Sequence, residues 1–412
     1  MASAPIRFVL AASTLAAGVL VASLASPHPA SPQAEQCPLL GVVPGSRSLL
    51  VRVDSRTLRP LLGRRISVGP HLHSWALSPD RSRLAFSPHP GGVVYFVDAR
   101  TLQPRGKMVF SGDGLAVWLA PRRLLWIQSS EFALADPTTR RHLMSKRIDG
   151  QVLVGVRVRD RVALLVAPSE GVGPSRLLIV DAVGGARSVD VARIRSGWSS
   201  CGGSQPGLTL DPAQRRVFVV GADDTVAEVE LEILAVSYHS LGSTTSPLPP
   251  ADVCESRLRT ARFLAGGLIA VSGFDSRQFR GADGRRYARF DPAGLHLVDV
   301  GSWSTRTLDD DADSFRVAER QLLATGLRWD SSVSGEVTGM GVAAYALDGA
   351  TRFHLFEGKR VWVVEAYTGR AYVSFERGPV AVVDLERGAM VGERSTPVPR
   401  LLVDDGVSLF GR

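Results

Sequence analysis

Short apolar runs and polar turns alternate along most of the chain. Runs rich in Val, Leu and Ile recur between clusters of Gly, Pro, Asp and Ser, and no long helical periodicity follows the N-terminal segment. A period of two, bounded by turn residues, is typical of β-strands joined in hairpins. We therefore predict an all-β fold.

One signature repeats, an apolar strand that ends in an acidic residue and enters a turn. It occurs in "VVYFVDART", "LLIVDAVGG" and "VAVVDLERG", among others. An aspartate at the start of a turn accepts a hydrogen bond from a backbone N–H two residues on, which fixes the register of a hairpin. We interpret these residues as turn formers rather than catalytic acids. They are Asp54, Asp98, Asp136, Asp181, Glu230, Asp299, Asp348 and Asp384.

A second hairpin precedes each signature, as in "WALSPDRSRLAF". Two antiparallel hairpins in roughly 45 residues make a four-stranded unit with the period of a β-propeller blade. We predict a single β-propeller of eight four-stranded blades over residues 37–412, with seven blades as the alternative if one unit is an insertion. Residues 401–410 and the segment around 49–56 would share one blade, so that pairing of the N- and C-terminal strands closes the ring.

The segment "WALSPDRSRLAF", followed by "VVYFVDARTLQ", resembles the blade cadence of bacterial exported WD40-like, YncE-like and TolB-like propellers. In those proteins a Ser-Pro-Asp turn joins the inner strands. The resemblance implies a propeller fold and a role as an exported binding scaffold. It assigns no catalytic residue, because these families share none.

The N-terminus predicts export. Arg7 precedes an apolar run over residues 8–25, and a Pro/Ser/Ala stretch follows. This order is typical of a secretory signal peptide, and residues 1–34 would comprise the signal peptide and a Pro/Ser/Ala linker. Because a run of about 18 residues approaches the length of a membrane span, an uncleaved signal anchor is the alternative. Either way we expect a secreted or extracytoplasmic protein.

Charge and cysteine usage narrow the partners. The chain has 48 basic and 40 acidic residues and no Lys/Arg run, so we predict no nucleic-acid partner. In an oxidising compartment two of the three cysteines should pair. Cys201 and Cys254 fall in successive interblade connections and form the predicted disulfide; the alternative pairs Cys37 with one of them.

The long connections predict where binding occurs. In a propeller the connections between blades and between second and third strands share one face, and long loops on a rigid scaffold carry binding residues. On this face "SRQFRGADGRRYARF" places five arginines, Arg277, Arg280, Arg285, Arg286 and Arg289, which favour carboxylate, sulfate or phosphate partners. Trp198 could stack on a ligand, as could Trp303, although propeller tryptophans usually pack between blades. The connections are 168–175, 196–207, 242–257, 274–294 and 329–341.

Candidate catalytic and metal chemistry is sparse. His71 and His73 are two residues apart and point the same way on extended backbone, but zinc needs three or four ligands, so we predict no metal site and no cofactor. "DDDADS" lacks the glycine of a calcium loop, so Asp309, Asp311 and Asp313 are expected in a solvated interblade loop. No G-x-S-x-G, H-E-x-x-H or phosphate-binding glycine loop occurs.

These observations favour a binding or scaffolding module over an enzyme. We expect a monomer that recognises a protein, a peptide or a cell-envelope component through the interblade face. We expect membrane contact only through an N-terminal anchor. The alternative is a propeller enzyme of lyase or hydrolase type, acting on a small extracellular substrate with His71 or His73 as general base.

Overall fold

The computed structural model describes most of the chain after the N-terminal segment. All described residues belong to Cys37–Arg412, one of the two compact units into which the chain divides. The predicted signal segment, Cys37, His71 and residues 403–410 lie outside the described part. Within the described part, no helix is long and apolar enough to cross a membrane. The structure describes residues 39–402 except for 55–56, 71, 89–90, 242–253, 282, 319, 333–336, 368, 376–377 and 395–398.

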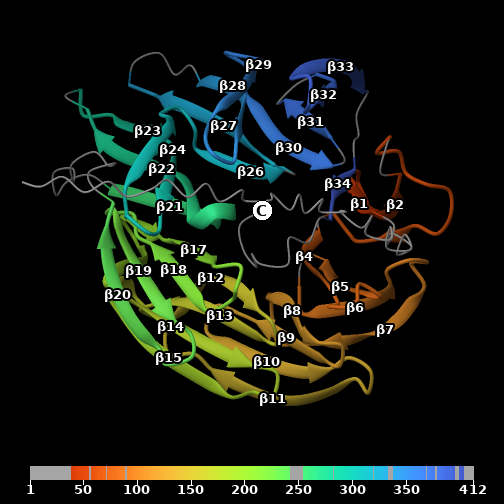
Figure 1. The fold of residues 1–412 in the computed structure, drawn as a ribbon. Coiled ribbons are helices and arrows are strands. Elements are labelled where there is room, and N and C mark those ends of the chain that lie inside the picture. The colour runs from red at the N-terminus through yellow and green to blue at the C-terminus, as the bar shows by residue number, and fades with distance from the viewer. Residues whose placement is uncertain are drawn as a thin grey trace, which may run out of the picture. The chain divides into compact units, whose positions relative to one another are not determined.

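Five sheets have four strands each and are arranged in a ring (Figure 1). Their strand orders are β3-β2-β1-β34, β4-β5-β6-β7, β8-β9-β10-β11, β17-β18-β19-β20 and β30-β31-β32-β33. The strands are β1 Leu39–Val43, β2 Leu49–Val53, β3 Ile66–Ser67, β4 Leu72–Leu77, β5 Arg83–Pro88, β6 Val93–Asp98, β7 Pro104–Val109, β8 Leu115–Ala120, β9 Arg123–Ile127, β10 Glu131–Asp136, β11 Arg141–Arg147, β17 Gly207–Leu210, β18 Arg216–Val220, β19 Thr225–Glu230, β20 Ala235–Ser240, β30 Val361–Tyr367, β31 Arg370–Phe375, β32 Val380–Asp384, β33 Ala389–Arg394 and β34 Arg400–Leu401.

The sixth sheet has 14 strands. Its main path is β12-β13-β14-β15-β16-β21-β22-β23-β27-β28-β29, and β24, β25 and β26 pair beside it. One short 3-10 helix, Ala265–Gly267, joins β21 to β22. The strands are β12 Gln151–Val158, β13 Arg161–Ala167, β14 Gly171–Asp181, β15 Ala186–Ser199, β16 Gly202–Gln205, β21 Cys254–Phe263, β22 Leu268–Arg280, β23 Arg286–Pro292, β24 Leu295–Asp299, β25 Thr305–Asp309, β26 Ser314–Ala318, β27 Gln321–Asp330, β28 Val337–Ala346 and β29 Thr351–Leu355.

Apolar side chains between neighbouring sheets form the core. Between the sheets β4-β7 and β8-β11, for example, Phe96 meets Trp118 edge to face with ring centroids 6.1 Å apart, and Phe110 stacks on Trp126. The Trp118 indole N–H donates to the carbonyl of Ala76 at 3.1 Å, which satisfies its one polar atom inside the core. Packing of this kind holds successive sheets together.

The acidic turn signature does what the sequence predicts. Asp98 Oδ1 accepts from the backbone N–H groups of Arg100 and Thr101 at 3.1 and 3.0 Å. The same capping occurs at Asp299, whose pKa is lowered by the backbone N–H and hydroxyl of Ser302. The prediction that these aspartates are turn formers is confirmed for Asp54, Asp98, Asp136, Asp181, Asp299, Asp348 and Asp384.

The two ends of the described chain meet in one sheet, but through a strand that the sequence reading missed. β34 pairs with β1, with Gly41 opposite Leu401 and Val42 opposite Arg400. The expected neighbour, β2, lies one strand further out. The N-terminal side therefore contributes three strands to this sheet rather than two. The run "LLGVV" of β1 follows a proline and does not alternate with polar residues, so its pattern does not mark it as a half-buried strand.

Candidate functional site

Six strands of the large sheet are much longer than those of the small sheets. β14, β15, β21, β22, β27 and β28 span 10 to 14 residues, whereas the strands of the small sheets span 2 to 7. The extra length, together with β16 and β23, covers most of the segments that the sequence predicted as long loops. That prediction was wrong for the described residues, because their backbone groups are satisfied by pairing with one another.

These extra lengths join into one continuous surface, here called the extension sheet. β16 follows β15 in a tight hairpin and runs parallel to β21, with Gly202 opposite Glu255. β22 and β23 form a second hairpin, and β23 pairs with the end of β27. The extension sheet comprises residues 171–174, 195–199, 202–205, 254–258, 274–280, 286–292, 327–330 and 337–339.

The predicted disulfide crosslinks the extension sheet where β16 and β21 begin. Cys201 and Cys254 are bonded, with their Cα atoms 4.6 Å apart. The parallel register that sets Gly202 beside Glu255 brings the preceding residue of each strand together. The prediction of a Cys201–Cys254 bridge is therefore confirmed.

The two faces of the extension sheet differ in burial. On β21, Arg257 is buried, whereas its neighbours Ser256 and Leu258 are half-buried. On β22, Asp275 is buried and Gln278 is exposed. Because side chains alternate between faces with a period of two, the face that carries Arg257 and Asp275 packs on the protein at β21 and opens to solvent at Arg289 on β23, whereas the other face meets solvent along the hairpin. We call them the buried face and the exposed face.

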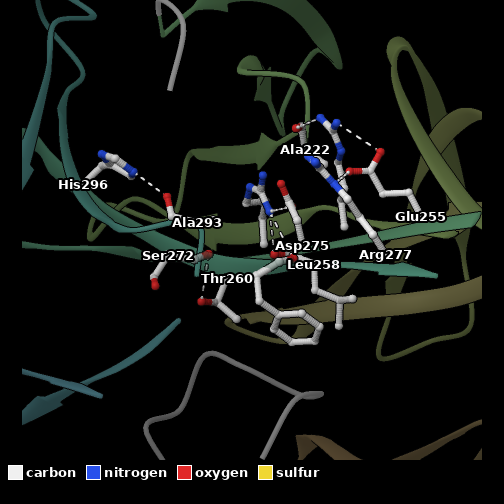
Figure 2. Close-up of polar contacts among 12 residues, drawn as sticks. Ala222, Glu255, Leu258, Thr260, Ser272, Asp275, Arg277, Ala293 and His296 are labelled. Carbon is white, nitrogen blue, oxygen red and sulfur yellow. Dashed lines mark hydrogen bonds and ion pairs between the residues drawn. The ribbon is translucent and has the colours of Figure 1, made fainter. Parts of the chain in front are cut away.

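The buried face carries a network of ion pairs (Figure 2). Glu255 joins two arginines, with Oε1 3.0 Å from Arg277 Nε and Oε2 3.1 Å from Arg257 Nη2. Arg259 Nη1 lies 2.8 Å from Asp275 Oδ1 and also donates to the carbonyl of Leu258 at 3.0 Å. Breaking a buried pair leaves an uncompensated charge, so these contacts fix the geometry of the sheet.

A small cavity lies beside this network. Its lining includes Arg259, Ser272 and His296, and Arg259 Nη2 is buried there without a hydrogen-bond partner among the described residues. His296 Nε2 lies 2.8 Å from the carbonyl of Ala293 (Figure 2). Its Nδ1 lies 3.0 Å from Thr307 Oγ1. Both ring nitrogens of His296 are thus engaged, and the cavity is of a size that suits an ordered water molecule.

The exposed face carries aromatic and small residues in one row. Each member is the direct cross-strand partner of the next, from β15 through β16, β21, β22 and β23 to β27. Trp198 is 38% exposed and packs over Gly203, where a Cβ atom would collide with the indole. The row consists of Trp198, Gly203, Ser256, Ser276, Phe290 and Trp329.

The structure divides the predicted arginines between the two faces. Arg280 and Arg286 lie directly opposite each other and share the exposed face with Trp198. Arg277 lies on the opposite face and is paired with Glu255. Arg285 lies in the turn between the strands, and its side chain is 82% exposed. The predicted arginine loop is therefore a β-hairpin. One of its faces carries arginines in ion pairs, and the other carries Arg280 and Arg286.

Arg289 belongs with the paired charges. Its Nε lies 2.7 Å from Asp291 Oδ2 and 4.0 Å from Asp330 Oδ2. At the turn, the hydroxyl of Tyr287 donates to Asp283, and this hydrogen bond lowers the pKa of the Asp283 carboxyl. The acidic residues of the hairpin are thus engaged by groups other than Arg280 and Arg286.

β-Bulges turn two ring side chains outward on inner strands. The register of β4 shifts at His73, and that of β30 shifts at Trp362. His73 is exposed, and Trp362 is 74% exposed. Bulges of this kind re-aim side chains. His73 stands out in the sequence through its neighbour His71, whereas nothing marks Trp362, since neither spacing nor composition reveals a bulge in a single strand.

The acidic segment 309–313 begins at the last residue of β25, and only Asp311 of the three predicted loop aspartates is exposed, so the prediction of a solvated loop is wrong for Asp309 and Asp313. Asp309 accepts a hydrogen bond from the Tyr345 hydroxyl at 2.5 Å, and burial together with Asp309 raises the pKa of Tyr345. Asp313 accepts from the backbone N–H of Leu327 at 2.8 Å, and Asp311 pairs with Arg328 at 2.9 Å. No group of three or more His, Cys, Asp or Glu side chains could hold a metal within the described residues.

The other predicted aromatic residue has a packing role. Trp303 stacks on His239 with ring centroids 3.7 Å apart and also contacts Phe218. The buried network of Glu255, Arg257 and Asp275 was missed altogether. Its signal was present in "CESRLRT", where charged residues at every second position share one face of a strand.

Sheets that follow one another around a ring, with almost no helix, define a β-propeller protein. Dihydro-heme d1 dehydrogenase NirN, solved in complex with DHE, is similar with a TM-score of 0.57 and 15% identity over 88% of this chain and 74% of that chain. Apo AztD from Citrobacter koseri is similar with a TM-score of 0.54 and 12% identity over 88% and 96% of the two chains. At these identities the likeness concerns the fold. No protein-family model and no curated protein sequence matches the chain.

Proposed function

We propose that this protein is an exported β-propeller of the WD40-like, YncE-like or TolB-like kind that binds a partner through the exposed face of its extension sheet. The partner would be a protein, a peptide or a cell-envelope component. The observation that carries the proposal is the division of charge in the β22-β23 hairpin. Its buried face is neutralised by ion pairs, whereas its exposed face presents Arg280 and Arg286 side by side.

The charge division argues for binding rather than for stability. Like charges directly opposite each other in a ladder cost up to about 1 kcal/mol. Within the described residues, neither Arg280 nor Arg286 pairs with a carboxylate that would remove this cost. A bound partner that carries negative charge would remove it.

The sheet pairing supports eight blades. Three runs of four antiparallel strands occur inside the large sheet: β12 to β15; β21, β22, β24 and β25; and β26 to β29. With the five small sheets they would complete an eight-bladed ring, in which the extension sheet is an addition to three blades. An electron-density map that shows seven repeating units around the axis would contradict this count.

Export is supported by the Cys201–Cys254 disulfide and by the apolar N-terminal run. Blocking free thiols in intact cells should leave Cys201 and Cys254 unmodified unless a reductant is added first. Modification of both without reductant would place the folded protein in a reducing compartment.

The test of the binding function uses one charged substitution on the exposed face. Ser276 lies between Ser256 and Phe290 in the row, so Ser276→Glu would repel a negatively charged partner without removing a buried contact. Ser188→Glu, on an exposed position of β15, is the matched control. Immobilised wild-type protein and the control should capture the same envelope component, and Ser276→Glu should not. Equal capture by all three proteins would refute the assignment of this face.

A second candidate function is catalysis at His73. The bulge that exposes this side chain on an inner strand is the observation in its favour. One solved structure of similar fold is of a protein named as a dehydrogenase, which supports considering an enzyme as the second candidate. Any hydrolase or lyase activity found by screening should fall at least about 100-fold in His73→Ala if His73 is the general base. Unchanged turnover would remove the candidate.

A further inference from the structure

The exposed face of the extension sheet is positively charged and carries no acid on its central strands. Arg280 and Arg286 face each other across β22 and β23. The acids Glu255, Asp275 and Asp291 all occupy the alternate register positions and so lie on the buried face. The exposed positions of β21, β22 and β23 are Cys254, Ser256, Leu258, Phe274, Ser276, Gln278, Arg280, Arg286, Ala288, Phe290 and Pro292.

The guanidinium groups of Arg280 and Arg286 have more N–H donors than their hydrogen bonds within the described residues use. Arg280 Nη1 donates to the carbonyl of Gly284 at 3.1 Å, which holds the side chain at the hairpin tip. A guanidinium has five N–H donors, so several are left for a ligand. The nearest acid in the turn, Asp283, accepts from Tyr287 at 2.5 Å and from the backbone of Arg285 at 3.0 Å. Two adjacent guanidinium groups suit a carboxylate or sulfate better than a neutral group.

The exposed indole of Trp198 lies on the same face as Arg280 and Arg286, well away from them. Trp198 is separated from Ser276 by three ladder steps, or about 14 Å, and Ser276 from Arg280 by four residues of β22, or about 13 Å. The positions between them carry the hydroxyl of Ser256 and the amide of Gln278. A ligand that engages both ends must therefore be an extended polymer with several repeating units.

The strand pairing disfavours an extended peptide as this polymer. Peptides commonly bind to sheets by adding a strand to a free edge. β16, β21 and β22 each have a strand on both sides, so they offer side chains rather than a backbone edge. An indole that stacks, hydroxyl and amide groups that hydrogen-bond, and paired guanidinium groups fit a sugar chain that carries carboxylates.

We infer that the exposed face of the extension sheet binds an anionic polysaccharide. This inference rests on the proposed binding function and names its partner class. Trp198 stacks on a sugar ring, Ser256, Ser276 and Gln278 bond to hydroxyls, and Arg280 with Arg286 holds a carboxylate. Binding should weaken as salt rises, because exposed charge pairs are screened.

The experiment measures binding of the full chain to polygalacturonate and to its methyl-esterified form, which has the same backbone without the charge. The double variant Arg280→Gln/Arg286→Gln should lose at least about tenfold in affinity. Arg64→Gln/Arg65→Gln removes the same charge from two exposed positions between β2 and β3 and should lose less than about threefold. Trp198→Ala should lose about five- to tenfold. Trp362→Ala, which removes another exposed indole, should bind like the wild type.

Three results would overturn the inference. Binding of polyglutamate as tightly as polygalacturonate, with no effect of Trp198→Ala, would show an acidic polypeptide site. Equal loss in the two arginine double variants would show a long-range field rather than a site. If wild type binds no polygalacturonate while Ser276→Glu still abolishes capture of an envelope component, the polysaccharide inference fails and the proposed function stands. If Ser276→Glu changes nothing either, both fail.

Discussion

Cys201 and Cys254 lie side by side because β16 and β21 run parallel, with Gly202 opposite Glu255. The Cα atoms are 4.6 Å apart and the two cysteines are separated by 53 positions in the sequence. Parallel neighbours cannot be joined by a short turn, and here the chain forms the whole sheet β17-β20 before it returns. The disulfide therefore closes a long loop at the point where the pairing has no local connection.

Reduction of this disulfide should destabilise the extension sheet. Closing a loop of 53 residues is worth about 4 kcal/mol by the chain-entropy estimate. We expect Cys201→Ser/Cys254→Ser to lower the free energy of unfolding by up to about that amount, and to speed amide exchange in β16 and in residues 254–258. Urea unfolding and hydrogen exchange measure the two effects. Exchange that is unchanged in β16 would show that the strand pairing alone holds the sheet.

Glu255 should be the most sensitive residue of the buried network. Its carboxylate contacts both Arg257 and Arg277, and its side chain is 11% exposed. Glu255→Gln keeps the shape but leaves two guanidinium groups without their charge partner, so we expect a loss of about 3 kcal/mol in urea unfolding. Asp160→Asn, which alters a pair with Arg161 that is largely exposed, should stay within about 0.5 kcal/mol. Similar losses in the two variants would mean that Glu255 is better solvated than its contacts indicate.

Gly202 should be indispensable to the β16-β21 pairing. Its φ is +120°, and a Cβ atom there would collide with the carbonyl oxygen of Glu255. Gly202→Ala should therefore cost about 2 to 3 kcal/mol, because strain and a backbone clash combine. Gly284→Ala, at a positive φ of +76° but in open space, isolates the conformational cost of about 1 kcal/mol. The two variants are compared by thermal unfolding, and equal costs would argue against the clash.

Local chemistry made the repeating strands predictable. The alternation of apolar and polar residues predicted β4, β5 and β6. Asp98 predicted the turn after β6, because its carboxylate accepts hydrogen bonds from the backbone of residues two and three positions further on. The Cys201–Cys254 pair was also predictable, because it needs only that two connections share a face. Such features depend on short stretches of sequence.

The extension sheet was not predictable in the same way. In "SRQFRGADGRRYARF" both faces of the hairpin are polar, so the alternation that reveals a half-buried strand is absent. Arg277 is half-buried and paired with Glu255 on β21, and Arg280 is exposed, although the two residues look alike in the sequence. The pairing of β16 with β21 is parallel and distant, and no local signal encodes it. The segments chosen for the candidate site were therefore predicted as long loops, whereas the structure has most of their described residues in paired strands.

Asp313 should make stability depend on pH. Burial raises the pKa of this carboxyl to about 6, while its Oδ2 accepts a hydrogen bond from the backbone N–H of Leu327 at 2.8 Å. The folded state holds this proton more tightly than the unfolded state, whose pKa is near 3.8. The stabilisation is thus complete below about pH 4 and is lost as pH rises to about 6, by up to about 3 kcal/mol.

Asp313→Asn removes this titration and keeps an oxygen that can accept from Leu327. The variant should therefore gain stability relative to wild type as pH rises from 4 to 7.5, with most of the change between pH 4 and 6. Urea unfolding at both pH values measures it, with the exposed neighbour Asp310→Asn as control. If the free energies of unfolding of Asp313→Asn and wild type differ by the same amount at both pH values, the Asp313 carboxyl has the same pKa in the folded and unfolded states. Its hydrogen bond with Leu327 of β27 would then leave the carboxyl in contact with water.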